Sequence, residues 1–403
     1  MKKLLFLLAG LFVLCGCVAP EEMLRNPIVN TPETAFSDIV IGAALPLTGK
    51  HAEAGNDMLP GAQAAVDSLN KNRGISGRRV KLEVCDTQST PAGASNAMRV
   101  LAEKGATVVI GGYSTYETTG LTAGAERERV PLFVPCATAD DISGKSPFVF
   151  RTGCTDSQQA DGLAAYLWYW RQVKKIGILI DMRVESEYER NVARAAAQSF
   201  SSLGGYVAQS ANYTDIPSCV EAMRQVMASA PQAIVVSAIG KEAAQMVKAL
   251  RKLGYAGIIC GADGWDRNDF FSTLGSDFAP GECFYVTFFS NEYKDDEFAV
   301  FSEAFRKKFY HLPGVHATST RDAVIMAAGC IINCENIRQF RRNWLSLQNF
   351  FGASSIYNPK RTGDVDRMLF INSVTAPGIH GKYPGTRLIR GFMHSKLESY
   401  KFD

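Results

Sequence analysis

From Asp38 onward, short apolar runs of strand length alternate with longer stretches in which apolar residues recur every three or four positions. The short runs are continuous and rich in Val, Ile and Leu, which is typical of strands buried on both faces. The longer stretches have the period of helices that cover a core with one apolar face. The pattern therefore predicts a parallel sheet covered by helices. Strands are expected at 39–45, 80–85, 107–110 and 131–134, and helices at 61–70, 92–104 and 117–128.

The same alternation starts again after the extended segment 148–152. Two βαβ series joined by a short connection predict an α/β fold of two doubly wound parallel-sheet lobes. Periodicity leaves open which lobe the C-terminal elements complete. The second series predicts strands at 175–180, 233–236, 258–260 and 283–289 and helices at about 188–203 and 241–253, and the C-terminal part predicts helices at 297–309, 318–332 and 338–350 and strands around 368–373.

The N-terminus has the pattern of an export signal. Two lysines precede the apolar stretch 4–14, which is too short to be a stable membrane span. The segment 14–17, Leu-Cys-Gly-Cys, resembles the bacterial lipobox, in which Cys17 would receive lipid and become the new N-terminus. An ordinary signal peptide with two incidental cysteines is the alternative. We expect a signal peptide over 1–17, a proline-containing tether over 18–37 and a lipid-anchored protein in the periplasm or at the cell surface.

Composition excludes several classes of protein. A net charge of +3 over 403 residues, with no dense Lys/Arg block, argues against nucleic acid as a partner. Eight cysteines remain beyond the signal segment, and an exported compartment permits disulfides without indicating which would form. No Cys-x-x-Cys pair occurs and the five histidines lack metal-ligand spacing, so we expect neither a metal nor a cofactor. Cys330 and Cys334, one helical turn apart, are expected to be buried thiols.

Candidate binding residues follow the predicted strands. Open parallel sheets bind ligands just outside the carboxyl ends of their strands. The residues at these points are hydroxyl-bearing, small, aromatic and acidic, which suits a small zwitterion better than a phosphate. They are 46–49, Asp86, 113–116, 136–138, 181–188, Ile239 and 263–265.

Several short motifs in the first lobe together carry a family resemblance. They are 42–46 with Gly49, Gly61-Ala62 with Asn70, Gly74-Ile75-x-Gly77-x-x-Val80, Asp86 with Pro91, Val109-Ile110-Gly111, Pro135-x-Ala137-Thr138 and Phe150-Arg151-Thr152. At this density and spacing, the chain resembles the type I periplasmic binding proteins, specifically the branched-chain amino acid receptors of ABC transporters. The resemblance runs from Ile39 to about Phe288 and more weakly to Val374.

The resemblance implies a two-lobed clamp that closes on a small amino acid or related amide and presents it to an ABC transporter permease. The hinge would be crossed three times, near 151–152, near 285–288 and after Ser354. We expect a monomer without enzymatic activity. The first lobe would contain 38–152 and 286–354, and the second lobe 153–285 and 355–403.

The resemblance also assigns the α-carboxylate of the ligand to donors of the first lobe. By position these are Ser114, Thr115, Cys136, Ala137 and Thr138, through backbone N–H and hydroxyl groups. Without the family, Thr115 and Thr138 are as well explained as helix N-caps.

The second lobe would supply an acid and two covering side chains. Asp263 stands where the family places the carboxylate that meets the α-ammonium, and Tyr188 stands where an aromatic covers the ligand. Ile239 occupies a ligand-facing position that is usually a tyrosine in the branched-chain receptors, so branched-chain specificity does not transfer directly. The alternative for Asp263 is an Asp-Gly turn residue, and Tyr188 and Trp265 could be rim or core aromatics.

Three other classes of function compete with solute uptake. An enzyme is disfavoured because the segment 112–116, Gly-Tyr-Ser-Thr-Tyr, lacks the second glycine of a nucleophile elbow and the first turn lacks a dinucleotide motif. A sensory module remains open, since the same clamp could pass its closure to a signalling partner. An adhesion or structural lipoprotein would leave the family motifs unexplained.

Overall fold

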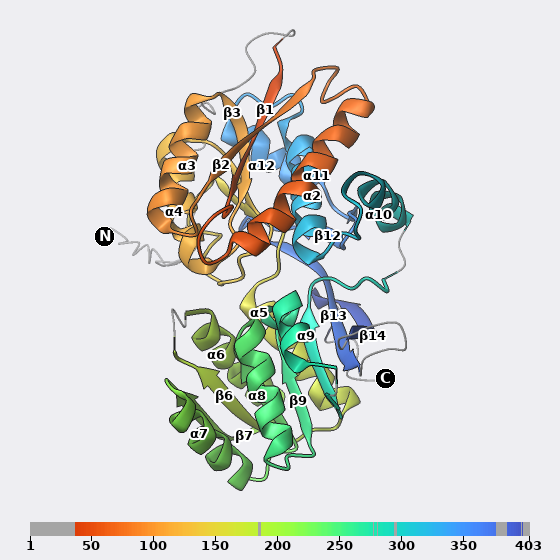
Figure 1. Ribbon diagram of the computed structural model, residues 1–403. Helices are drawn as coiled ribbons and strands as arrows, with labels where there is room; N and C mark the ends of the chain where they lie inside the picture. The colour runs from red at the N-terminus through yellow and green to blue at the C-terminus, as the bar shows by residue number, and fades with distance from the viewer. Residues whose placement is uncertain are drawn as a thin grey trace, which may run out of the picture.

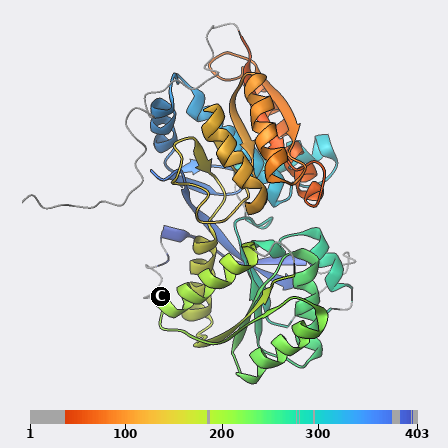
Figure 2. The ribbon, with the colours of Figure 1, turned by 90° about the vertical axis from the view of Figure 1, so that its left-hand side faces the viewer.

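The computed structural model describes residues 37–183, 187–276, 278–279, 281–293, 296–375, 385–395 and 397. It consists of two α/β lobes, one above the other in Figure 1 and in the perpendicular view of Figure 2. The signal peptide and nearly all of the tether expected from the sequence lie outside the described residues. No helix in the described part of the chain is both long and apolar enough to span a bilayer.

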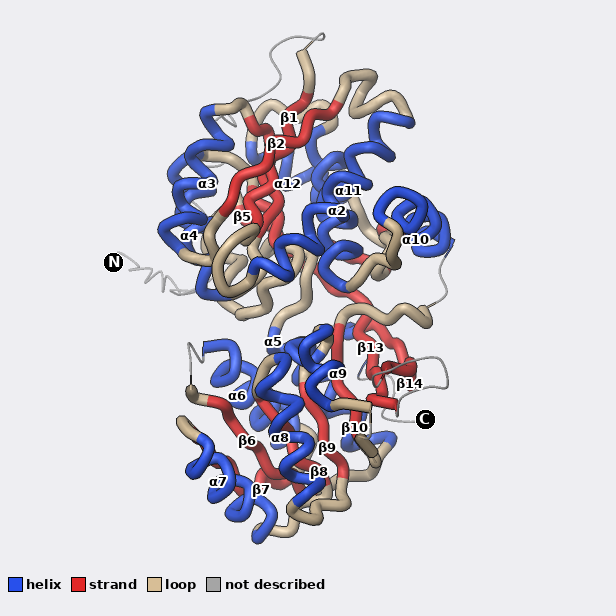
Figure 3. Tube along the Cα trace, in the orientation of Figure 1, coloured by secondary structure: helices blue, strands red, loops and turns tan. Residues whose placement is uncertain are grey.

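The first lobe is a five-stranded parallel sheet in the order β2-β1-β3-β4-β5. β1 lies between two partners and is buried along nearly its whole length, which explains its continuous apolar run. Helices α3 and α4 lie on one side of the sheet and α2 and α11 on the other (Figures 1 and 3). The elements are β1 (Ile39–Leu45), α2 (Ala52–Lys71), β2 (Val80–Asp86), α3 (Pro91–Glu103), β3 (Ala106–Gly111), α4 (Thr115–Glu128), β4 (Leu132–Val134), β5 (Val149–Arg151), α10 (Asp296–Phe309), α11 (Val315–Ile331), α12 (Ile337–Ser346), β11 (Phe350–Phe351) and β12 (Ile356–Pro359).

The second lobe contains the parallel strands β7-β6-β8-β9-β10, extended by the antiparallel strands β13 and β14. Side chains of alternate strand residues pack into two separate cores, one beneath α5 and α6 and the other beneath α7, α8 and α9. The elements are α5 (Asp156–Ala165), η1 (Tyr166–Trp170), β6 (Lys175–Asp181), α6 (Glu187–Ser202), β7 (Tyr206–Tyr213), α7 (Ile216–Ala228), β8 (Ala233–Ser237), α8 (Gly240–Lys252), β9 (Ile258–Gly261), η2 (Asp263–Trp265), α9 (Asn268–Leu274), β10 (Cys283–Thr287), β13 (Val365–Thr375) and β14 (Gly385–Met393).

Two lobe boundaries lie later in the chain than the sequence predicted. Strand β10 belongs to the second sheet, and Phe288 packs in the second-lobe core, so the second crossing follows this residue rather than preceding 286. The third crossing lies within β13, because Tyr357 and Val365 pack in the first-lobe core whereas Leu369 packs in that of the second lobe. The predicted lobe boundary between 354 and 355 therefore lies too early, because Tyr357 of β12 still packs with the first lobe.

The three crossings meet at one buried arginine. Arg367 of β13 is fully buried, and its guanidinium donates to the carbonyl oxygens of Thr152 and Phe288, both at 2.7 Å. It also donates to Ser354 Oγ at 3.2 Å. The guanidinium carbon lies 5.0 Å from the ring centroid of Phe288 and 4.9 Å from that of Tyr357, within cation–π range. One side chain thus joins all three segments that connect the lobes.

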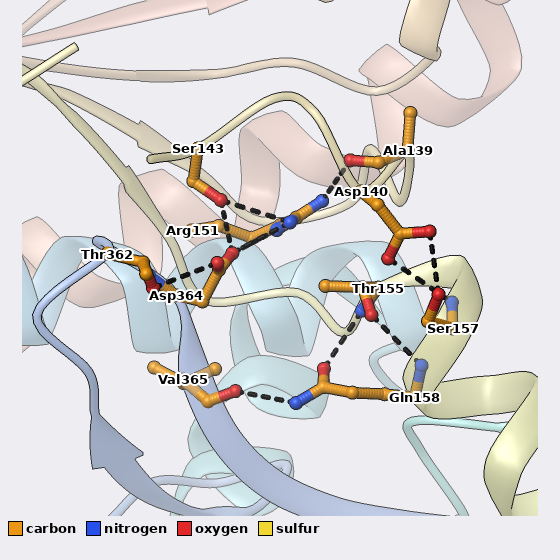
Figure 4. Close-up of polar contacts among 10 residues, drawn as sticks. All are labelled: Ala139, Asp140, Ser143, Arg151, Thr155, Ser157, Gln158, Thr362, Asp364 and Val365. Atoms are coloured by element: carbon orange, nitrogen blue, oxygen red, sulfur yellow. Dashed lines mark hydrogen bonds and ion pairs between the residues drawn. The ribbon is translucent and has the colours of Figure 1, made fainter. Parts of the chain in front are cut away.

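A second set of polar contacts supports the first and third crossings (Figure 4). The buried Arg151 of β5 donates to Asp364 Oδ1 through Nη2 at 2.7 Å and through Nε at 2.9 Å. Thr155 caps α5, and Gln158 on the first turn of that helix donates to the carbonyl oxygen of Val365 at 2.9 Å. These bonds hold the start of β13 against the strand and helix that frame the first crossing.

Some elements differ from the predicted pattern for identifiable reasons. Helix α2 begins nine residues before the predicted start at Gly61 and accommodates Pro60 in its interior. Strand β7 was not predicted, because it is an edge strand with a partly exposed face and lacks a continuous apolar run. The predicted helix 338–350 ends at Ser346 and is followed by the short strand β11.

All eight cysteines of the body are free thiols. Cys330 is buried as predicted, whereas Cys334 is half-buried and its thiol lies 3.3 Å from the carbonyl oxygen of Asn336. Hydrophobic packing, without covalent cross-links, therefore stabilises both lobes.

Candidate functional site

A small cavity of about 100 Å³ lies between the lobes, at the carboxyl ends of both sheets. Its walls come from loops of both lobes and from the hinge residue Phe288. Of the residues that the family resemblance assigned to the ligand, all but Ala137 line it, whereas the further candidates 46–49, Asp86 and Trp265 do not. The lining residues are His51, Tyr113, Ser114, Thr115, Cys136, Thr138, Tyr188, Ile239, Asp263, Gly264, Arg267, Phe288 and His316.

The first-lobe wall is built around the N-terminus of α4. Ser114 is the N-cap of this helix, and its Oγ accepts a hydrogen bond from Glu117 N at 3.2 Å. Thr115 is the first helical residue, so its side chain and the first-turn N–H groups lie at the positive end of the helix dipole. A helix N-terminus of this kind favours a negatively charged group, such as the carboxylate of an amino acid zwitterion. The N-cap of α4 is therefore Ser114 and not Thr115, and Thr115 lines the cavity.

The loop after β4 completes this wall. Cys136 and Thr138 line the cavity, whereas Ala137 between them is buried and its N–H already donates to the carbonyl oxygen of Gly112 at 3.2 Å. The geometry therefore argues against the predicted contact of Ala137 with a ligand. Burial raises the pKa of the Cys136 thiol, so this side chain is protonated and contributes a small, weakly polar surface.

Asp263 is the acid of the second-lobe wall. It is the first residue of the short helix η2, which begins one residue beyond β9, and its Oδ1 accepts a hydrogen bond from the Tyr188 hydroxyl at 2.7 Å. Its own N–H donates to Gln159 Oε1 at 3.0 Å, which fixes the backbone of the turn. Burial raises the pKa of Asp263, although the hydrogen bond from Tyr188 opposes the rise. The carboxylate is thus poorly hydrated, and a cation in the cavity would stabilise its charged form.

Tyr188 has a structural task as well as a place in the lining. Its hydroxyl donates to Asp263 and accepts from Gly264 N at 2.9 Å, so it orients the acid and its turn together. Ile239, the N-cap position of α8, adds an apolar surface beside them. Trp265, by contrast, is fully buried and its ring is stacked on Phe270 at 4.9 Å, which confirms the core reading of this aromatic.

A further polar group on the cavity wall has partners that the sequence did not predict. The ring of Tyr113 lies between those of His51 and His316, with both centroid distances 5.1 Å. Arg267 of the second lobe donates through Nη1 to the Tyr113 hydroxyl and therefore connects the lobes across the cavity. Tyr113, two residues after β3, was among the candidates that follow the predicted strands, but its neighbours were not predicted. The sequence offered the histidines only as possible metal ligands. His51 is the N-cap of α2 and His316 lies on the first turn of α11, two helices that are distant in sequence and adjacent in space.

The described residues hold no group of three or more His, Cys, Asp or Glu side chains arranged to bind a metal ion. The site is a desolvated carboxylate on one lobe facing helix N–H groups and hydroxyls on the other. It offers an acceptor for a positively charged group and donors for a negatively charged group, as a zwitterion requires.

Comparison with known proteins decides the family. The family model described as periplasmic binding protein matches residues 38–331, which is well over half of the chain. The chain belongs to the periplasmic binding protein family. Members bind solutes outside the cytoplasm and do not convert them, so this protein is an extracytoplasmic binding protein and not an enzyme.

Two curated relatives to which the chain is similar are named as Leu/Ile/Val-binding proteins. The Leu/Ile/Val-binding protein BraC3 of Rhizobium johnstonii is 27% identical over 254 residues, which are 62% of this chain and 68% of that protein. Leu/Ile/Val-binding protein homolog 3 of Brucella melitensis is 30% identical over 154 residues, which are 38% of this chain and only 42% of that protein.

A solved structure confirms the type I fold. The branched-chain amino acid transporter substrate binding protein LivJ of Streptococcus pneumoniae, solved with isoleucine, superposes with a TM-score of 0.75. The match covers 88% of this chain and 99% of LivJ at 22% identity. The likeness extends through both lobes of this binding protein.

Proposed function

We propose that this binding protein is the extracytoplasmic substrate-binding component of an ABC-type amino acid uptake system. It binds a small amino acid or related amide between its lobes, and the hinge at Arg367 closes the lobes on the ligand. The observation that carries the proposal is that one cavity is lined by the carboxylate of Asp263 from the second lobe and by the N-terminus of α4 from the first lobe. Both relatives are named as Leu/Ile/Val-binding proteins, which supports an amino acid as the ligand.

The two walls of the cavity bind opposite charges of the ligand in this proposal. Ser114, Thr115 and Thr138 bind the α-carboxylate, and the helix dipole adds to their hydrogen bonds. Asp263, oriented by Tyr188, binds the α-ammonium. Burying an ammonium requires a charged, hydrogen-bonded partner, and the desolvated Asp263 gains most from such a pair.

The proposal includes the lipid anchor on Cys17, which keeps the protein near the permease of the membrane. Its support is the signal pattern and the lipobox-like segment of residues 1–17. A monomer is sufficient for this role, because both walls of the cavity come from one chain.

The test is a thermal-shift screen of the purified protein across the common amino acids and small amides, followed by titration calorimetry of each hit. A ligand present at a hundred times its dissociation constant should stabilise the folded state by about 2.7 kcal/mol. Absence of any stabilising compound in the panel would contradict the proposal.

Asp263→Asn tests the assignment of the ammonium site. It removes the charge but keeps the shape, so amino acid binding should weaken by about 2 to 5 kcal/mol, the range for losing one member of a buried charge pair. Asp266→Asn is the matched control, because this acid lies one turn away, bonds to Thr287 and does not line the cavity. If both variants bind like the wild type, Asp263 is only a turn residue.

A further inference from the structure

The polar group of Tyr113 and Arg267 has no task in binding a plain zwitterion. Both side chains line the cavity, one from each lobe. The α-carboxylate and α-ammonium are already served by the α4 N-terminus and by Asp263. The two side chains therefore face whatever the ligand carries in addition to its backbone groups.

The hydrogen bonds of Arg267 leave donors for a ligand. Its Nε–H donates to Asp269 Oδ1 at 3.0 Å, Nη2 to Asp269 Oδ2 at 3.4 Å, and Nη1 to the Tyr113 hydroxyl. A guanidinium has five N–H donors, so two are not used by these bonds. Within the described part of the chain, no acceptor is found for either.

Tyr113 adds a third donor. Its oxygen accepts from Arg267, so its own proton is directed to another acceptor, and the described residues supply none. Burial raises the pKa of Tyr113 to about 12, and the hydroxyl therefore keeps its proton at physiological pH. The flanking rings of His51 and His316 hold the phenol in place.

The cavity lining has no unpaired carboxylate that could accept from these donors. Among the described residues that line the cavity, Asp263 is the only acid, and it is paired with Tyr188. Asp269 balances Arg267 from outside the cavity, with its side chain 36% exposed and thus partly screened by water. A ligand carboxylate would satisfy the three donors and place a negative charge beside Arg267.

We propose that the cavity takes an amino acid whose short side chain ends in a carboxylate, which Tyr113 and Arg267 bind together across the two lobes. This inference rests on the proposed function and names its substrate class. Ile239 and Phe288 provide apolar contact for the methylene stem, and the small volume of the cavity favours aspartate over longer side chains.

Titration calorimetry with L-aspartate, L-asparagine, L-alanine and L-valine tests the inference on the wild-type protein. We expect aspartate to bind at least tenfold more tightly than the other three, because a hydrogen bond to a charged group is worth more than one to a neutral group. Tyr113→Phe should weaken aspartate binding about tenfold more than it weakens alanine binding. Arg267→Met should remove the preference for aspartate over asparagine.

Asn268→Ala is the matched control. This exposed residue follows Arg267, lies outside the cavity lining and approaches Glu53 of the other lobe at 3.5 Å. Its loss should change the affinities for all four probes equally. If Arg267→Met does not fold, the affinities of the wild type for the four ligands and the effect of Tyr113→Phe still test the inference.

Two outcomes would overturn the inference, and they differ in what else they overturn. If valine binds as tightly as aspartate, the acidic side chain is wrong while the amino acid binding site stands. If none of the four probes nor any other amino acid binds the folded protein, the proposed function is wrong as well.

Discussion

Glu117 should make the stability of the first lobe depend on pH. The side chain is fully buried on the first turn of α4, directly behind Ser114 and Thr115 of the cavity wall. Its Oε1 accepts from Thr87 Oγ1 at 2.8 Å, whereas Oε2 is buried without a hydrogen-bond partner. Burial, with a smaller contribution from the negative charge of Asp86, raises the pKa of Glu117 from 4.5 to about 7.

The sign of the effect follows from proton binding. Between about pH 4.5 and pH 7 the folded state holds the Glu117 proton while the unfolded state releases it, so stability falls as the pH rises through this window. Below pH 4.5 both states are protonated and the cost is absent. At about 1.4 kcal/mol for each pKa unit, ionised Glu117 costs about 3 kcal/mol above pH 7, which is an upper value because water can enter around the charge.

Glu117→Gln removes the ionisation and keeps an oxygen for Thr87. We expect the variant to match the wild type at about pH 4 and to exceed its stability by up to about 3 kcal/mol at about pH 8. Urea unfolding followed by circular dichroism at several pH values measures this difference. Burial also raises the pKa values of Asp156 and Glu189 to about 7. These two groups contribute equally to the stability of the wild type and of the variant, so their effect cancels in the difference.

Glu126→Gln, on the exposed face of the same helix, controls for the change in net charge. A stability difference between wild type and Glu117→Gln that is the same at every pH would refute the reasoning. It would mean that Glu117 ionises at the same pH in the folded and unfolded states.

Three further predictions concern the hinge, closure and the anchor. Arg367→Met should lower the free energy of unfolding by about 2 to 5 kcal/mol, because it strands the carbonyls of Thr152 and Phe288 in the buried hinge; thermal melts check this, and a change below about 0.5 kcal/mol would contradict it. Saturating ligand should reduce the radius of gyration measured by small-angle scattering relative to the ligand-free protein, and identical profiles would count against hinge closure. Cys17→Ser should move the protein from the membrane to the soluble fraction, and retention in the membrane after signal cleavage would exclude the lipid anchor.

The agreement between sequence and fold is best where strands are buried on both faces. β1, β3 and β8 lie inside parallel sheets, so their local composition already reflects the tertiary environment. β7 was missed because an edge strand needs no continuous apolar run. The late lobe boundary at β13 was also missed, because a strand that is buried in both lobes looks the same on either side of the crossing.

For the site, the sequence by itself determined which residues follow the strands, and hence Thr115, Thr138 and Asp263 as candidates, since the carboxyl ends of parallel strands meet at one edge. Only the tertiary structure decided how these groups are used. It directs the N–H of Ala137 to Gly112, buries Trp265, and brings His316 and Arg267 to Tyr113 from distant parts of the chain. The physical reason is that a residue's place after a strand is a local property, whereas its partners and its hydration depend on how the two lobes pack across the hinge.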